Sequence, residues 1–129
     1  MTTSDPLAAL LVNEDSIARE ELAMGLAPFI QLTEQGGLWP LPPFENLSSA
    51  NKVLCLLLAV KAMAMLGLRE KERAAPGELV EMSGMPAGTV RPNLSKLAEK
   101  RLVARDKGGY WISAHGARKA LEALAVENG

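Results

Sequence analysis

Apolar side chains recur at helical spacing along much of the chain, beginning near its N-terminus. The first such segment starts after Asn13, a favourable N-cap, and Pro28 ends it. Its apolar positions include Ile17, Leu22 and Leu26, and several of the positions between them are acidic. The pattern predicts an amphipathic helix with an acidic outer face.

Residues 29–41 have a different period. The runs FIQL and LWPL flank the sequence TEQGG, and short apolar runs around a glycine turn are typical of a β-hairpin. Pro40 lies in the second run and has no N–H to donate, so we expect an edge strand there. The proline-rich sequence PLPPF should then act as a stiff connector to the next helix.

The central helix is predicted from a stretch that is apolar nearly all round, residues 53–68. Ser48 or Ser49 is the expected N-cap, and Gly67 is the expected stop at the C-terminal end. A helix of this kind must be covered on most sides, and residues 7–44 are available to cover it within the same chain.

A second subunit is the alternative cover for this helix. In that case we expect a homodimer through Leu56, Leu57, Met63 or the N-terminal segment.

The second half of the chain predicts two helices in close succession. Pro76 stands at a typical first helical position, and Gly84 ends this short helix. After the turn SGMPAG, the stripe Val90, Leu94 and Leu97 predicts a longer helix that reaches Lys100 or Arg101.

Pro92 determines where this longer helix is expected to begin. A proline in a helix interior costs about 3 kcal/mol, but the first turn is free of that penalty because its N–H groups have no helical acceptor. If Thr89 is the N-cap, Pro92 falls at the third helical position, and Gly88 supplies the bend before it.

From Leu102 onward the period shortens again. The runs LVARD and YWIS flank KGG, which predicts a second hairpin with a basic tip. Tyr110 and Trp111 are neighbours on one strand and face opposite sides, so we expect one in the core and one half-exposed. Ser113 is the expected N-cap of a last helix with an apolar stripe through Leu121 and Leu124.

Composition places the chain among ordinary globular proteins. Of its 129 residues, 48% are apolar and 22% are charged, and aromatics make up only 4%, so the core should be aliphatic. The single cysteine, Cys55, lies in an apolar run and should be a buried, inert thiol. The start of the chain lacks a basic leader, and Lys61 interrupts the longest apolar segment, so we expect a cytoplasmic protein without a membrane span.

The net charge of −1 hides a gradient along the chain. Residues 1–47 hold one arginine against seven acids, a net charge of −6. Residues 86–119 hold eight lysines and arginines against two acids, a net charge of +6. Such a division lets one face attract phosphates while another repels them, which would orient the molecule on a polyanion.

Residues with catalytic chemistry are scarce. His115 is the only histidine, it lies about 60 residues from Cys55, and no group of His, Cys and Asp has the spacing of a zinc site or a nucleophile–base pair. A glycine-rich phosphate-binding loop of the Walker type is also missing. We therefore expect no enzyme, no cofactor and no metal site.

Residues 48–113 resemble a winged helix-turn-helix DNA-binding domain. The resemblance is carried by ELVEMSGMPAGTVRPNLSKLAEKRLVARDKGGYWIS, which has a short helix, a glycine turn, a second helix and two wing strands in the family's order. The predicted fold class is therefore mainly α with small β-hairpins: an acidic helix-and-hairpin extension over residues 1–47 and a winged-helix domain with a C-terminal helix over residues 48–129. Two positions depart from the family pattern, because Val80 stands where alanine is favoured and Pro92 where most members have a polar residue.

The resemblance implies sequence-specific binding of double-stranded DNA, with the second helix in the major groove and the wing on the backbone or minor groove. We then expect a transcriptional regulator, with Thr89, Arg91 and Asn93 as candidates for base contacts. The candidates for phosphate contacts are Lys96, Lys100, Arg101, Arg105, Lys107, Arg118 and Lys119.

The alternative is a winged-helix adaptor that binds protein and does not read DNA. Leu38 and Trp39 would then be the contact residues. Trp39 is the candidate for an exposed aromatic, although a core position is favoured for it.

Overall fold

The chain is mainly helical, with two small antiparallel hairpins, as the sequence predicts. The computed structural model describes residues 5–11 and 14–129, and the side chains of residues 5–11 and 19–129. The predicted cap Asn13 and the side chain of Ile17 lie outside the described parts. The elements in chain order are the 3-10 helix η1 (Pro6–Leu10), α1 (Glu14–Leu26), β1 (Ile30–Leu32), β2 (Leu38–Pro40), α2 (Pro42–Glu45), α3 (Ser49–Met65), α4 (Pro76–Ser83), α5 (Ala87–Glu99), β3 (Ala104–Asp106), β4 (Gly109–Trp111) and α6 (Ala114–Asn128).

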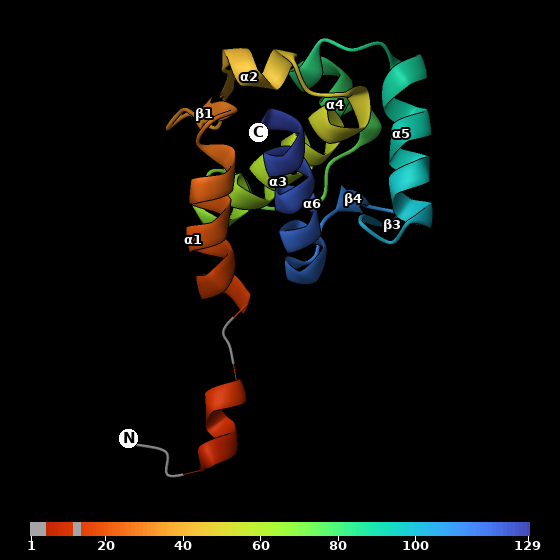
Figure 1. Ribbon diagram of the computed structural model, residues 1–129. Coiled ribbons are helices and arrows are strands. Elements are labelled where there is room, and N and C mark those ends of the chain that lie inside the picture. Colours follow the sequence, from red (N-terminus) through yellow and green to blue (C-terminus); the bar gives the residue numbers. More distant parts are fainter. Residues whose placement is uncertain (1–4, 12–13) are drawn as a thin grey trace.

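The apolar helix α3 forms the centre of the core, and α1 and α5 lie on opposite sides of it (Figure 1). Every residue from Val53 to Val60 is at most 2% exposed, and α4 and α6 also pack against this helix. The cover is thus supplied within the chain, and α1 and β1 of the acidic extension share this core.

Three residues named for a dimer surface belong to that core. Leu56 and Leu57 are 0% exposed and Met63 is 2% exposed, so they cannot reach a second copy. Other parts of the same chain cover these three side chains, so they offer no support for a dimer surface. A dimer through the N-terminal segment is a separate prediction.

The first hairpin forms where it was predicted, with Gln31 opposite Trp39. Its two faces alternate: Ile30 is buried against the core, whereas Trp39 is 65% exposed on the other face. The favoured core position for Trp39 is therefore wrong, because strand alternation turns its ring away from α3. The expected connector PLPPF forms the short helix α2 instead, with Pro42 at its start and Phe44 buried beneath it.

The predicted ends of several helices are confirmed. The Ser48 hydroxyl accepts a hydrogen bond from the Asn51 amide at 3.2 Å, and Ser113 caps α6 in the same way. Gly67 and Gly84 follow the last turns of α3 and α4 with φ angles of 76° and 72°, a conformation that glycine adopts without strain.

The start of α5 differs from the prediction. The carbonyl of Pro86 accepts hydrogen bonds from the amides of Thr89 and Val90, so the helix begins at Ala87 and Pro92 lies inside it. Pro92 therefore removes the donor that would bond the Gly88 carbonyl. That carbonyl belongs to an exposed residue, so water can supply the missing hydrogen bond, and the helix continues through the proline.

The second hairpin is anchored to the loop before α4. Ala74 and Tyr110 exchange two backbone hydrogen bonds of 2.9 Å, which adds a third segment to the β3–β4 pair. Gly109 makes this approach possible: its φ is 125°, and a Cβ at this position would lie 2.6 Å from the Ala74 carbonyl oxygen. Tyr110 and Trp111 are both partly buried, and Tyr110 packs against the core, so the expected difference between a core ring and a half-exposed ring is present only in part.

Candidate nucleic-acid interface

Helix α5 presents a polar face to solvent along its whole length. Its apolar stripe, Val90, Leu94 and Leu97, is at most 4% exposed and packs on α3 and α4. The opposite side has small and charged residues and no large apolar side chain. The exposed residues of α5 are Ala87, Gly88, Arg91, Pro92, Ser95, Lys96 and Glu99.

Six exposed cations lie on α5, in the turn after it and on the second hairpin. We call them the basic surface: Arg91, Lys96, Lys100, Arg101, Arg105 and Lys107. The chain turns sharply after α5, because Arg101 has a φ of 61° and the amides of Leu102 and Val103 both return to the Leu97 carbonyl. The hairpin therefore starts at the C-terminal end of α5, where Figure 1 shows the two elements next to each other.

The charges of the basic surface are not neutralised by neighbouring carboxylates. None of the six cations takes part in an ion pair with any residue that the structure describes. Asp106, between Arg105 and Lys107, bonds Arg73 at 2.9 Å instead. Glu99 is thus the acid that remains on the exposed face of α5.

Arg73 links the hairpin to the loop before α4. Its guanidinium stacks on the Trp111 ring at 4.0 Å from the centroid and bonds Asp106. The Gly108 amide also donates to Asp106 at 2.7 Å, and this bond together with Arg73 lowers the pKa of the carboxyl. The turn that presents Lys107 is therefore held from two sides.

The three candidates for base contacts are placed unequally. Arg91 is exposed near the N-terminal end of α5, whereas Thr89 and Asn93 are half-buried on its flank. The Asn93 side-chain amide donates to the Thr89 carbonyl at 2.8 Å, so one of its donors is already engaged within the helix. Arg91 has the freest side chain of the three.

The two candidates on α6 are not part of the basic surface as defined. Arg118 donates to Glu21 of α1 at 3.1 Å, so its charge is directed toward the acidic extension. Lys119 is exposed on the same helix.

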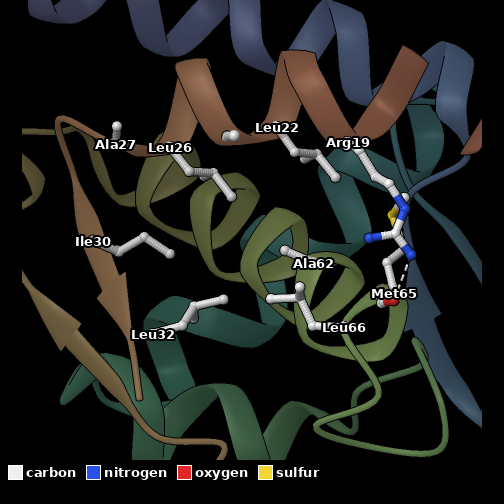
Figure 2. A pocket seen from close by; sticks show the side chains of 10 residues that line it. Arg19, Leu22, Leu26, Ala27, Ile30, Leu32, Ala62, Met65 and Leu66 are labelled. Atoms are coloured by element: carbon white, nitrogen blue, oxygen red, sulfur yellow. Dashed lines mark hydrogen bonds between the residues drawn. The ribbon is translucent and has the colours of Figure 1, made fainter. Parts of the chain in front are cut away.

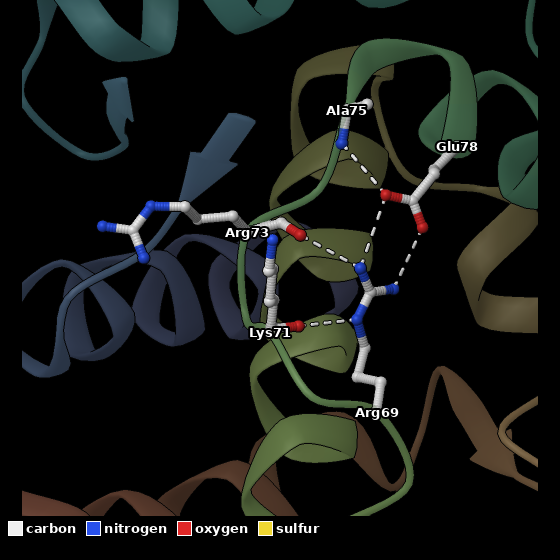
Figure 3. A network of polar contacts seen from close by, with 5 residues as sticks. All are labelled: Arg69, Lys71, Arg73, Ala75 and Glu78. Carbon is white, nitrogen blue, oxygen red and sulfur yellow. Dashed lines mark hydrogen bonds and ion pairs between the residues drawn. The ribbon is translucent and has the colours of Figure 1, made fainter. Parts of the chain in front are cut away.

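A polar network fixes the loop between α3 and α4 (Figure 3). Arg69 donates to the carbonyls of Lys71 and Arg73 and pairs with Glu78, and Glu78 accepts a bond from the Ala75 amide at 3.1 Å. None of these contacts was predicted from the sequence. The alternating charges of the loop were the available signal, but which residues pair depends on its path.

Glu78 carries the pH dependence of this network. Partial burial by itself would raise the pKa of Glu78, but the Ala75 amide and the Arg69 guanidinium outweigh it and lower the pKa below 4.5. A lowered pKa in the folded state means that the stabilisation is present above about pH 4.5 and is lost as the pH falls through the folded-state value.

We therefore expect Glu78→Gln to lower the free energy of unfolding at neutral pH and to make little difference in strong acid. Urea unfolding of the variant and the wild type between pH 3 and 7 measures this, with Glu81→Gln, an exposed position on the same helix, as the control. A deficit that stays constant across this pH range would show that the loss comes from packing and not from ionisation.

The described residues do not suggest a catalytic or metal centre. Burial raises the pKa of the Cys55 thiol to about 12, so it carries no thiolate at neutral pH. Within residues 5–11 and 14–129, no three His, Cys, Asp or Glu side chains form a group that could hold a metal ion. None of the helices in the described part combines the length and the apolar character needed to cross a bilayer.

Comparisons with family models, with curated proteins and with solved structures found no match to this chain. The assignment of a function therefore depends on the geometry and chemistry of the basic surface and its surroundings.

Proposed function

We propose that this protein binds double-stranded DNA in a sequence-specific manner and acts as a transcriptional regulator. In this proposal α5 lies in the major groove, and the β3–β4 hairpin contacts the backbone or the minor groove beside it. The observation that carries the proposal is the basic surface: six exposed cations on α5 and the adjoining hairpin, outside every ion pair of the described residues.

The order of the elements supports the same proposal. Helix α3, the segment at Ala74, α4, α5, the β3–β4 hairpin and α6 follow one another as they would in a winged helix-turn-helix domain. The Ala74–Tyr110 pairing holds the β3–β4 hairpin against the loop before α4, which would fix the position of a wing beside α5. We therefore propose a winged-helix fold for residues 48–129, preceded by the acidic extension.

The exposed face of α5 suits close approach to a duplex. The major groove of B-DNA is about 12 Å wide and admits one helix. Gly88, Pro92 and Ser95 leave the middle of this face without bulky side chains, and Lys96 adds a cation to it. Arg91 can reach a base edge, and the remaining lysines and arginines of the basic surface can contact phosphates.

Replacing Arg91 tests whether the protein recognises a specific DNA sequence. The experiment selects preferred duplexes from a random pool and then measures the affinity of wild type and Arg91→Ala for the selected and for a scrambled duplex. We expect Arg91→Ala to weaken binding of the selected duplex by about 1–3 kcal/mol while it changes binding of the scrambled one much less. Equal losses on both duplexes would reduce Arg91 to a phosphate contact, and no duplex binding at low salt would refute the proposed function.

One observation favours a second candidate, the protein-binding adaptor. Trp39 is 65% exposed on the outer face of the first hairpin, and exposed tryptophans are enriched at protein interfaces. For an adaptor, Trp39→Ala should abolish function in cells while neutralisation of the basic surface leaves function intact. A DNA-binding regulator should give the opposite result.

A further inference from the structure

An apolar groove opens between α1, β1 and the C-terminal half of α3 (Figure 2). Its volume is about 320 Å³, at the small end of the range for binding pockets, so it can take a few side chains. The apolar side chains that line it include Leu22, Leu26, Ile30, Leu32, Ala62 and Leu66. Leu66, at the rim, is 59% exposed.

Arg19 closes one end of this groove and does not serve as a handle for an anion. Its Nη2 donates to the carbonyl of Met65, the last residue of α3, at 2.7 Å. A cation at this place complements the negative end of the helix dipole. The groove therefore suits an occupant that is apolar and uncharged.

The N-terminal arm of the same chain is an occupant of that chemistry. Leu7, Leu10 and Leu11 are 68%, 76% and 78% exposed, and η1 buries none of its residues. Leu7 and Leu10 are three residues apart and lie on one side of the 3-10 helix η1, and Leu11 follows its last residue. Residues 6–13 contain no charged residue. In the sequence, leucines spaced by three and four residues are also the pattern that an amphipathic α-helix presents to an apolar groove.

The direction of the arm points to a second copy. In Figure 1 η1 lies beyond the N-terminal end of α1, away from the body of the molecule. The groove lies along the later part of α1 and the turn after it, from Arg19 to Ala27, and continues to β1. The arm thus lies away from the groove of its own chain.

We propose that two copies of this chain form a dimer in which the arm of each copy lies in the groove of the other. A single arm with three leucines offers less contact than the roughly 800 Å² per partner of a stable interface. A symmetric exchange places two arms and two grooves in one interface, and the basic surfaces on the other side of the core stay free. This proposal does not depend on DNA binding, and its test contains no DNA.

Cysteine cross-linking tests the contact directly. Leu10→Cys on the arm is mixed with Ala23→Cys under mild oxidation. Ala23 is exposed and lines the groove. One of the two chains carries a tag, so that mixed pairs can be separated from like pairs. The matched control is Met24→Cys, the next residue, which is 80% exposed and does not line the groove. Cys55 is buried and does not compete.

We expect Leu10→Cys to couple to Ala23→Cys several-fold more than to Met24→Cys. Equal coupling to both positions would overturn the proposal. So would a double variant, Leu10→Cys/Ala23→Cys, that forms its disulfide within one monomer, because the arm would then occupy its own groove.

A mass measurement in solution gives the second test. Light scattering on the uncross-linked wild type should give twice the chain mass, and Leu7→Glu/Leu10→Glu should halve it with an unchanged circular dichroism spectrum. Val126→Glu, which places the same charge on an exposed apolar position of α6, should remain dimeric. A wild type that stays monomeric at the highest soluble concentration would refute the dimer while leaving the basic surface and its proposed function untouched.

Discussion

Lys96→Gln/Lys100→Gln should weaken binding to any duplex by about tenfold or more at physiological salt, and to selected and scrambled sequences alike. Both side chains are exposed on or next to the outward face of α5 and lie outside the ion pairs of the described residues. A lysine that contacts a phosphate displaces a counterion. The slope of log K against log salt should therefore become shallower by roughly 0.9 for each contact removed. The measurement is a fluorescence anisotropy titration at several salt concentrations.

The control for this variant must change the net charge equally. Gln31→Glu/Gln35→Glu also lowers the net charge by two, at exposed positions of the first hairpin. Because this hairpin lies on the α1 side of the core, away from α5 in Figure 1, we expect little change in affinity or in salt slope. If both variants weakened binding equally, the effect would come from total charge and not from a defined surface.

Much of the fold could be predicted because local signals and tertiary packing agree. The stripe Val90, Leu94 and Leu97 predicts a helix, and the same residues are the ones that pack on α3 and α4. Ser48 and Ser113 cap helices by accepting bonds from amides three residues ahead. Both partners of such a bond lie within a few residues of sequence, so the contact can be predicted from the sequence alone.

The failures occur where a local rule competes with packing. The preference of proline for a first turn placed the start of α5 after Thr89, but the Pro86 carbonyl accepts the Thr89 and Val90 amides and the helix begins at Ala87. Solvent around Gly88 reduces the cost of the lost hydrogen bond, which the sequence pattern does not reveal. Trp39 was wrongly favoured for the core because hydrophobicity says nothing about which face of a strand turns inward.

The candidate site was predictable in its residue types and not in its contacts. The clustering of cations in residues 86–119 is visible in the sequence, and six of them prove to be exposed on α5 and the hairpin. Arg73 stacks on Trp111, which is 38 positions later in the chain, and bonds Asp106, which is 33 positions later. Such pairs depend on the tertiary path, as does the groove that α1, β1 and α3 form together.

Removing Glu72 should destabilise the protein far more than removing its partner Lys61. Lys61 is 8% exposed in the middle of the apolar helix α3, and its Nζ lies 3.1 Å from the Glu72 carboxylate. In Glu72→Ala this ammonium loses its counter-charge and stays buried, a change that costs about 3–5 kcal/mol in a fully buried pair. Because 32% of the Glu72 side chain is exposed, water screens part of the loss, and we expect about 2–3 kcal/mol.

Lys61→Met should be close to neutral or slightly stabilising, because it replaces a buried charge with an apolar chain of similar length among leucines. The midpoint of urea unfolding measures both effects, provided that the m-value is unchanged. Glu70→Ala, an exposed position in the same loop, should stay within about 0.5 kcal/mol of wild type. If Lys61→Met were as destabilising as Glu72→Ala, the ion pair would contribute net stability to the fold. The free-energy cost of burying the Lys61 ammonium in α3 would then be smaller than the gain from its pairing with Glu72.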